Sequence, residues 1–133
     1  MKEIFEHIEN NINKTINNLF RMVSQPSVSA QSNGFDRAPD LMCKIAEEYG
    51  LKTTILRPDN NGFPSIFAEK KSKNSDKTLL FYTHYDVQPP DPLELWESDP
   101  FKPEKRGDRL YGRGMSDDKG NIAARLAAIK AFL

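Results

Sequence analysis

One histidine and three aspartates are the residues whose types and spacing could support metal chemistry. His84 and Asp86 stand two positions apart at the end of the apolar run TLLFYTH (78–84), and Asp117 and Asp118 are adjacent in the turn GRGMSDDKG (112–120). Residues i and i+2 of a strand point to the same face of the sheet. A carboxylate beside an imidazole can fix the ring and its tautomer while the other ring nitrogen binds a metal ion.

Each motif alone also has an ordinary structural explanation. A histidine and an aspartate at this spacing are more often surface or structural residues than ligands. Two aspartates after a tight turn can both be helix N-caps. Adjacent aspartates do not easily point the same way, so one could face a metal while the other caps the helix that starts near Gly120. The metal hypothesis therefore depends on the two motifs belonging together.

The elements that must position these residues follow an α/β order. Apolar periodicity predicts one amphipathic helix over 2–23 and a second helix that starts at about 36 or 39 and ends at Tyr49, before Gly50. Strands are predicted over 51–58, 65–70, 78–84 and about 108–111, with a turn at 60–62, and an alanine-rich helix over 120–133. The run 78–84 is of the kind buried on both faces of a sheet, and His84 would lie at its carboxyl end, where open α/β sheets form their functional crevice.

Composition narrows the class of protein. The 133 residues carry nineteen basic and nineteen acidic side chains, so nucleic acid is not the leading partner. The basic stretch KKSKNSDK (70–77) is expected to be a solvated loop. The single cysteine, Cys43, excludes a disulfide within the chain and suits a cytoplasmic protein. The N-terminus resembles neither a signal peptide nor a membrane span.

The two motifs together resemble those of the zinc-dependent aminoacylase and carboxypeptidase family, which includes acetylornithine deacetylase, succinyl-diaminopimelate desuccinylase and carnosine-type dipeptidases. The resemblance rests on FYTHYDVQPP, WESDPF and RLYGRGMSDDKGN in this order, and more loosely on QPSVS and FPSIFAE. It implies a three-layer α/β/α catalytic domain with a mostly parallel mixed sheet. The alternative of a nucleotide-binding domain is weak, because the glycine turn fits neither a P-loop nor GxGxxG spacing.

The resemblance also implies a role for each motif residue. His84 would bind the first of two zinc ions, for which cobalt could substitute, and Asp117 would bridge the two. Asp86, counted with the catalytic residues, would orient His84, and the peptide bond after Asp117 would be cis. The implied reaction is hydrolysis of a peptide or amide bond in a dipeptide or N-acyl amino acid, in a protein that could be a homodimer.

The chain departs from the family where it ends. Leu133 lies inside an apolar helical pattern with no cap after it, so we expect residues 1–133 to be the N-terminal segment of the catalytic domain, without the lid domain and the C-terminal half. The general base and the remaining ligands would lie beyond Leu133. We therefore expect the chain alone to be inactive. The alternative is a non-catalytic truncated product or binding module that retains part of the metal site.

Other residues receive structural expectations. His7 is expected to be solvated and Trp96 to serve packing, while Tyr85 is expected to point away from the site into the core. Arg113 is expected to tie the glycine turn to a carboxylate or carbonyl. Lys119 could meet an anionic group.

Overall fold

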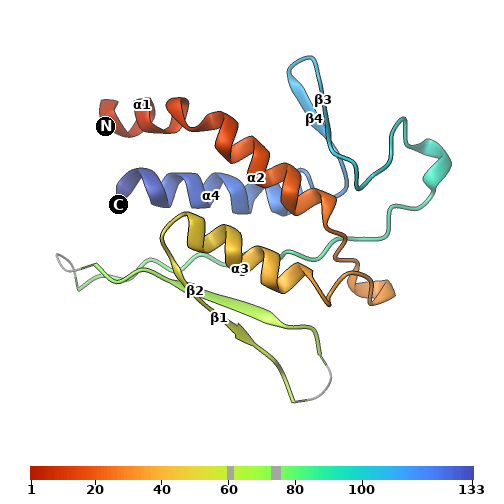
Figure 1. Ribbon diagram of the computed structural model, residues 1–133, viewed down its shortest axis with the longest axis horizontal. Helices are drawn as coiled ribbons and strands as arrows, with labels where there is room; N and C mark the ends of the chain where they lie inside the picture. Colours follow the sequence, from red (N-terminus) through yellow and green to blue (C-terminus); the bar gives the residue numbers. More distant parts are fainter. Residues whose placement is uncertain (60–61, 73–75) are drawn as a thin grey trace.

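The computed structural model describes residues 1–59, 62–72 and 76–133. Its helices are α1 (Lys2–Asn10), α2 (Ile12–Ser24), α3 (Ala38–Glu48) and α4 (Lys119–Phe132), with 3₁₀ turns η1 (Ser29–Gln31) and η2 (Leu93–Leu95). Its strands are β1 (Lys52–Leu56), β2 (Ser65–Glu69), β3 (Glu104–Arg106) and β4 (Arg109–Tyr111). Figure 1 shows α4 between the α1–α2 arm and α3, with the β1–β2 hairpin beyond α3. The α/β class is thus confirmed. None of the helices in the described ranges is long and apolar enough to cross a membrane.

The predicted N-terminal helix is interrupted at Asn11. The side-chain amide of Asn11 donates to the His7 carbonyl at 2.8 Å, and its backbone N–H is shared between the carbonyls of His7 and Ile8. Asparagine competes with helix hydrogen bonding in this way because its short side chain reaches the local backbone. The prediction of one continuous helix over 2–23 was therefore wrong, and α1 and α2 are two helices joined by a bend. His7 is exposed, as expected.

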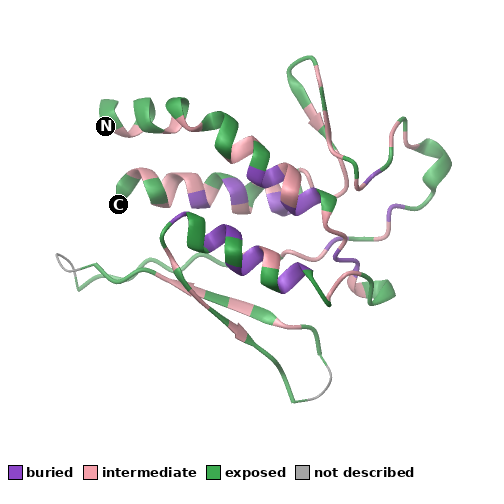
Figure 2. Ribbon diagram, in the orientation of Figure 1, coloured by how far each residue is buried: buried purple, intermediate pink, exposed green. Residues whose placement is uncertain are grey.

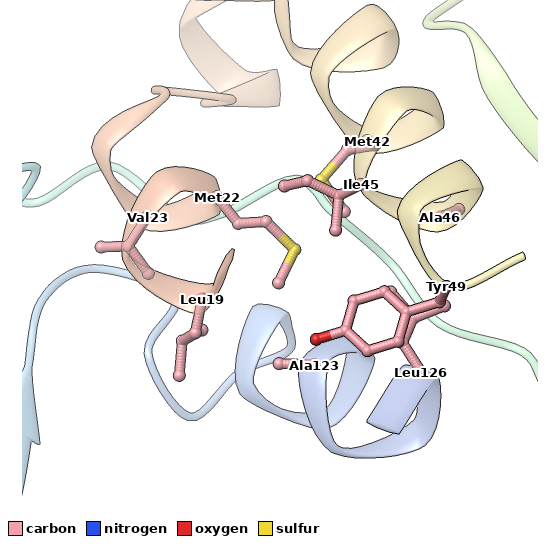
Figure 3. Packing of buried hydrophobic residues seen from close by; sticks show 9 residues of the cluster. All are labelled: Leu19, Met22, Val23, Met42, Ile45, Ala46, Tyr49, Ala123 and Leu126. Carbon is pink, nitrogen blue, oxygen red and sulfur yellow. The ribbon is translucent and has the colours of Figure 1, made fainter. Parts of the chain in front are cut away.

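The core lies where α2, α3 and α4 meet. Figure 2 shows the buried residues on the facing sides of these helices, and Figure 3 shows their side chains pointing toward one another. Met22 and Ile45 are almost fully buried, and full burial of such side chains contributes roughly 1.5–3 kcal/mol each. The cluster comprises Leu19, Met22, Val23, Met42, Ile45, Ala46, Tyr49, Ala123 and Leu126. This packing fixes the start of α4, and with it the glycine turn that precedes this helix.

The β1–β2 hairpin confirms two of the predicted strands. The strands are antiparallel with Ile55 opposite Ile66, and both contact α3. Ile66 and Ala68 face the helices and pack against the core. Residues 60–61 of the predicted turn and 73–75 of the predicted basic loop lie outside the described residues.

The apolar run 78–84 differs from its prediction. It is extended but pairs with no strand among the described residues, and Leu79, Leu80 and Tyr82 are 84%, 87% and 86% exposed. A sheet strand needs hydrogen-bonding neighbours, and here the contact comes from a helix: Arg125 of α4 donates to the Tyr82 carbonyl at 3.0 Å. The expectation of a strand buried on both faces was therefore wrong. The pairings within the described residues are the two antiparallel hairpins and isolated bridges, one of them parallel.

The predicted strand after Asp108 is present as β4, which pairs with β3 in a short antiparallel hairpin. We did not predict β3, because its three residues, EKR, are charged and carry no apolar alternation. In Figure 1 this hairpin projects away from the helices, and the chain returns from it into the glycine turn.

Candidate metal centre

Residues 85–87 are held in place by the loop that follows α2. Val87 forms a parallel bridge with Val28, and the Val87 N–H donates to the Ser27 carbonyl at 2.9 Å. The Ser27 hydroxyl donates to the Tyr85 carbonyl at 2.7 Å. Val28 and Val87 are buried, so this short pairing excludes water and fixes the backbone on which His84 and Asp86 are carried.

His84 lies between two carboxylates. Its Nδ1 is 3.0 Å from the Asp86 carbonyl oxygen and 3.3 Å from Asp86 Oδ1, while its Nε2 is 2.9 Å from Asp117 Oδ1. Both groups near Nδ1 are acceptors, so Nδ1 carries a hydrogen and Nε2 is the nitrogen available to a cation. The structure thus brings His84, Asp86 and Asp117 together, although their two motifs are about thirty residues apart.

The electrostatics of the site favour positive charge on the His84 ring. Partial burial by itself lowers the pKa of His84, but the hydrogen bonds to the Asp86 carbonyl and to Asp117, together with both carboxylate charges, outweigh burial and raise the pKa above its usual value. The same negative potential would attract a metal cation.

The two aspartate side chains of the glycine turn differ in exposure, since Asp117 faces solvent and Asp118 faces the protein. The Asp117–Asp118 peptide bond is cis, which confirms the bond geometry that the resemblance implies. The Asp117 side chain is 86% exposed next to His84, whereas that of Asp118 is 11% exposed and faces the protein. Gly114 allows the glycine turn to lie close to Val87: its φ is +82°, and a Cβ there would lie 2.6 Å from Val87 Cγ1.

Asp118 is the N-cap residue of α4 but makes no cap hydrogen bond with its side chain. The interpretation of the dipeptide as two N-capping aspartates is therefore wrong, and so is the expectation that one of them caps the helix while the other faces a metal. Its Oδ2 accepts the backbone N–H of His84 at 3.2 Å and lies 3.9 Å from the Arg125 guanidinium. Its Oδ1 accepts the side-chain amide of Asn121. Asp118 therefore ties the end of the run 78–84 to α4 through the backbone of His84, whereas Asp117 contacts the imidazole ring.

Asp86 uses both of its carboxylate oxygens. Oδ1 faces Nδ1 of His84, and Oδ2 accepts a hydrogen bond of 2.7 Å from the Ser29 hydroxyl. The adjacent Tyr85 points elsewhere, as expected: its hydroxyl donates to the Pro64 carbonyl, its ring packs against the core, and burial raises its pKa to about 12.

Lys119 is not available to an anionic ligand, contrary to expectation. It is 1% exposed, and its ammonium donates to the carbonyls of Met22 and Gln25 at 2.9 Å each. These carbonyls belong to the C-terminal end of α2, where helices leave carbonyls without intrahelical partners. Burial lowers the pKa of Lys119 to about 8. Arg113 behaves as expected, since it donates to the Pro89 carbonyl at 3.1 Å; it also lies over the Trp96 ring.

The donors near His84 fit part of a zinc site. Imidazole nitrogen and carboxylate oxygen are both zinc ligands. With hydrogen on Nδ1, a neutral ring would place the Nε2 lone pair against Asp117 Oδ1, and either a proton on Nε2 or a cation between the two atoms removes that repulsion. Within the described residues, however, no group of three His, Cys, Asp or Glu side chains could hold a metal ion. His84 and Asp117 therefore fit as two members of a larger ligand set.

Sequence reasoning weighed Asp118 only as a metal-facing residue or helix cap and not as a tie between His84 and α4, and it missed Arg125 and Ser29 as residues of this site. A signal existed for Asp118 and Arg125, because positions 118, 121 and 125 fall on one face of a helix. Ser29 had no comparable signal, since its partner is 57 residues away and no periodicity connects them.

Comparison with known proteins places these motifs in a family. The model of peptidase family M20/M25/M40 matches residues 80–133, which include His84 and both aspartates of the turn. A succinyl-diaminopimelate desuccinylase of Methylibium petroleiphilum is 40% identical over 89 residues, which are 66% of this chain and 23% of that protein. A desuccinylase of Delftia acidovorans is 33% identical over 125 residues, 92% of this chain and 32% of the relative.

Solved structures agree with the sequence relatives. The M20 family metallo-carboxypeptidase Sso-CP2 from Sulfolobus solfataricus matches 87% of this chain and 26% of its own at 39% identity, with a TM-score of 0.80. Human carnosine dipeptidase 1 matches 98% of this chain and 30% of its own at 26% identity, with a TM-score of 0.83. The chain thus spans about a quarter to a third of the length of these relatives. Residues 80–133 thus match the model of peptidase family M20/M25/M40, and the relatives and the shared fold extend that similarity over most of the chain.

Proposed function

We propose that residues 1–133 form the N-terminal segment of the catalytic domain of a zinc-dependent hydrolase. The whole protein would cleave a peptide or amide bond in a dipeptide or an N-acyl amino acid. The family supports hydrolysis, and relatives named as desuccinylase, carboxypeptidase and dipeptidase support an amide-like substrate. The lid domain and the C-terminal half of the catalytic domain would belong to the longer protein, which we expect to be cytoplasmic.

The observation that carries this proposal is the 2.9 Å approach of His84 Nε2 to Asp117 Oδ1, with the other side of the imidazole held by Asp86. His84 would bind one zinc ion, and Asp117 would bridge to a second. Bound there, zinc supplies Lewis-acid chemistry for hydrolysis, through activation of water and polarisation of the scissile carbonyl.

The chain's own residues then have distinct tasks. Asp86 keeps the hydrogen on Nδ1, so that the Nε2 lone pair stays directed at the metal position. Asp118 holds the backbone of His84 by accepting the His84 N–H. The carboxylate of Asp117 is exposed and would act as a ligand. None of these residues is placed to act as the general base for the water, which we assign to the part of the protein beyond Leu133.

For the chain alone we propose weak metal binding and no catalysis. Zinc sites ordinarily use three or four protein ligands, and two are present here, divided between two metal positions. This ligand shortage is also what favours the second candidate, a non-catalytic product or binding module that retains part of the site.

Zinc binding to the chain tests the assignment of ligands. Calorimetry should show weak, saturable zinc binding. We expect the affinity to fall about tenfold or more in His84→Ala and in Asp117→Ala, because each variant removes one of two donors. His7→Ala is the matched control, since it removes the other histidine of the chain from an exposed position on α1. Equal affinity in wild type and His84→Ala would show that the metal position is elsewhere.

The genomic reading frame separates the two candidate functions. If it continues past Leu133 with acidic residues and a distal histidine, the product of that frame should release amine from dipeptides or N-acyl amino acids, and the reaction should stop on chelation of metal. A stop codon directly after Leu133 would contradict the hydrolase and favour the non-catalytic candidate.

A further inference from the structure

The loop between α2 and η1 contacts the His84–Asp86 segment at three successive points. The Ser27 hydroxyl donates to the Tyr85 carbonyl, and the Ser27 carbonyl accepts the Val87 N–H. The Ser29 hydroxyl donates to the Asp86 side chain. The first two contacts hold the backbone. The third is different in kind, because it acts on a side chain that itself faces His84.

The two serines also differ in their surroundings. Ser27 is fully buried, so its hydrogen bond to the Tyr85 carbonyl is part of the packing. Ser29 is half-buried and is the first residue of η1, whose N-cap position is held by Val28. Its hydroxyl donates to Oδ2 of Asp86 at 2.7 Å, a short distance typical of a hydroxyl bonded to a charged carboxylate.

This contact determines how the carboxylate is turned. The terminal torsion of an aspartate is broad, so a carboxylate held at one oxygen can still rotate. Asp86 is held at both: Oδ2 by Ser29, and Oδ1 at 3.3 Å from His84 Nδ1. Rotation of the carboxylate away from the imidazole would break both contacts at once.

We propose that Ser29 is a positioning residue for the metal centre: it fixes the plane of the Asp86 carboxylate, and Asp86 in turn holds the His84 ring with Nε2 directed toward Asp117. The inference rests on the proposed function, because it assigns a purpose to the ring orientation. Ser29 touches neither substrate nor metal and acts only through Asp86.

Measurements of zinc affinity and thermal stability on the whole 133-residue chain distinguish a positioning role of Ser29 from a packing role. We expect Ser29→Ala to weaken zinc binding about tenfold, the lower end for partners that support a metal ligand, with little change in the thermal midpoint. Ser29→Thr keeps the hydroxyl and should restore affinity. Ser24→Ala, at an exposed position at the end of α2, is the control and should change neither the midpoint nor the affinity.

A double-mutant cycle tests whether Ser29 works through Asp86. In an Asp86→Ala background the carboxylate is gone, so Ser29→Ala should cause no further loss of zinc affinity. A loss of the same size with and without Asp86 would overturn the inference, as would a Ser29→Ala affinity within twofold of wild type.

A metal-free measurement distinguishes failure of this inference from failure of the proposed function. If wild type shows no His84-dependent zinc binding, the metal assignment fails, and the ring ¹⁵N shifts of His84 then decide on Ser29 alone. Ser29→Ala should move these shifts and leave those of His7 in place. Unchanged His84 shifts would overturn the positioning role, whatever the outcome with zinc.

Discussion

At Gly120, substitution by alanine has two opposing effects on stability: it improves the helix propensity and it creates a close contact with the backbone of Met115. Gly120 is the second residue of α4, and its φ lies outside the left-handed region, so alanine can adopt its backbone angles. Alanine in a helix is favoured over glycine by about 1 kcal/mol. On propensity alone, Gly120→Ala should stabilise the chain.

The tertiary contact predicts the opposite. A Cβ on residue 120 would lie 2.2 Å from the backbone carbonyl oxygen of Met115, whereas Cβ atoms essentially never lie closer than 3.0 Å to a neighbour. The obstacle is backbone within the glycine turn and cannot rotate away as a side chain could. Overpacking of this kind costs typically about 1–3 kcal/mol, occasionally more. We take the upper value and, after the gain in propensity, expect a net loss of about 2 kcal/mol in the free energy of unfolding.

Thermal unfolding followed by circular dichroism should resolve the two outcomes. At roughly 4 °C per kcal/mol for a chain of this size, Gly120→Ala should lower the midpoint by about 8 °C, whereas the propensity effect alone would raise it by about 4 °C. Ala124→Gly, at an exposed position of the same helix, is the control and should cost about 1 kcal/mol. A rise in the midpoint of Gly120→Ala would refute the close contact between the turn and α4.

Three further predictions concern stability. Hydrogen bonds from Arg21 lower the pKa of Glu48 below 4.5, so the pair adds stability above the unfolded-state pKa that is lost as pH falls through the folded-state pKa. Glu48→Gln should therefore cost at most about 1 kcal/mol at pH 7 in urea titrations and flatten the decline in stability below pH 4.5. Lys119→Ala removes a buried stem and the donor to two carbonyls and should cost about 2–3 kcal/mol, partly offset by loss of the buried charge; the exposed Lys130→Ala should leave the urea midpoint nearly unchanged. Ile45→Ala in the core should cost about 2–5 kcal/mol, and a loss below 1 kcal/mol would show that this core is loosely packed.

Periodicity was a reliable guide to the elements that carry their own apolar face. It predicted α3, β1, β2 and most of α4, because each buries one side against a neighbour. It did not reveal the bend at Asn11, where a side chain bonds the backbone of the same helix, or the exposure of the run 78–84. The composition of this run suited burial, but no strand in the described part of the chain pairs with it.

The candidate site was likewise predicted only in part from the sequence. His84, Asp86 and Asp117 could be selected because their spacing has chemical meaning in a strand and a turn, and the structure brings them together. Ser29 could not be selected, and the hydrogen bond from His84 to Asp118 could not be foreseen, because both contacts join segments far apart in the sequence. Such pairings become visible only when the fold places both partners.

The exposed apolar run has a practical consequence for experiments on the chain in solution. An extended stretch that has no strand partner among the described residues, and that carries exposed leucines and aromatic side chains, is a template on which other chains can add as strands. Self-association should therefore rise with concentration. Zinc titrations should accordingly be repeated over a dilution series, so that an affinity that tightens with protein concentration is recognised as a property of the aggregate.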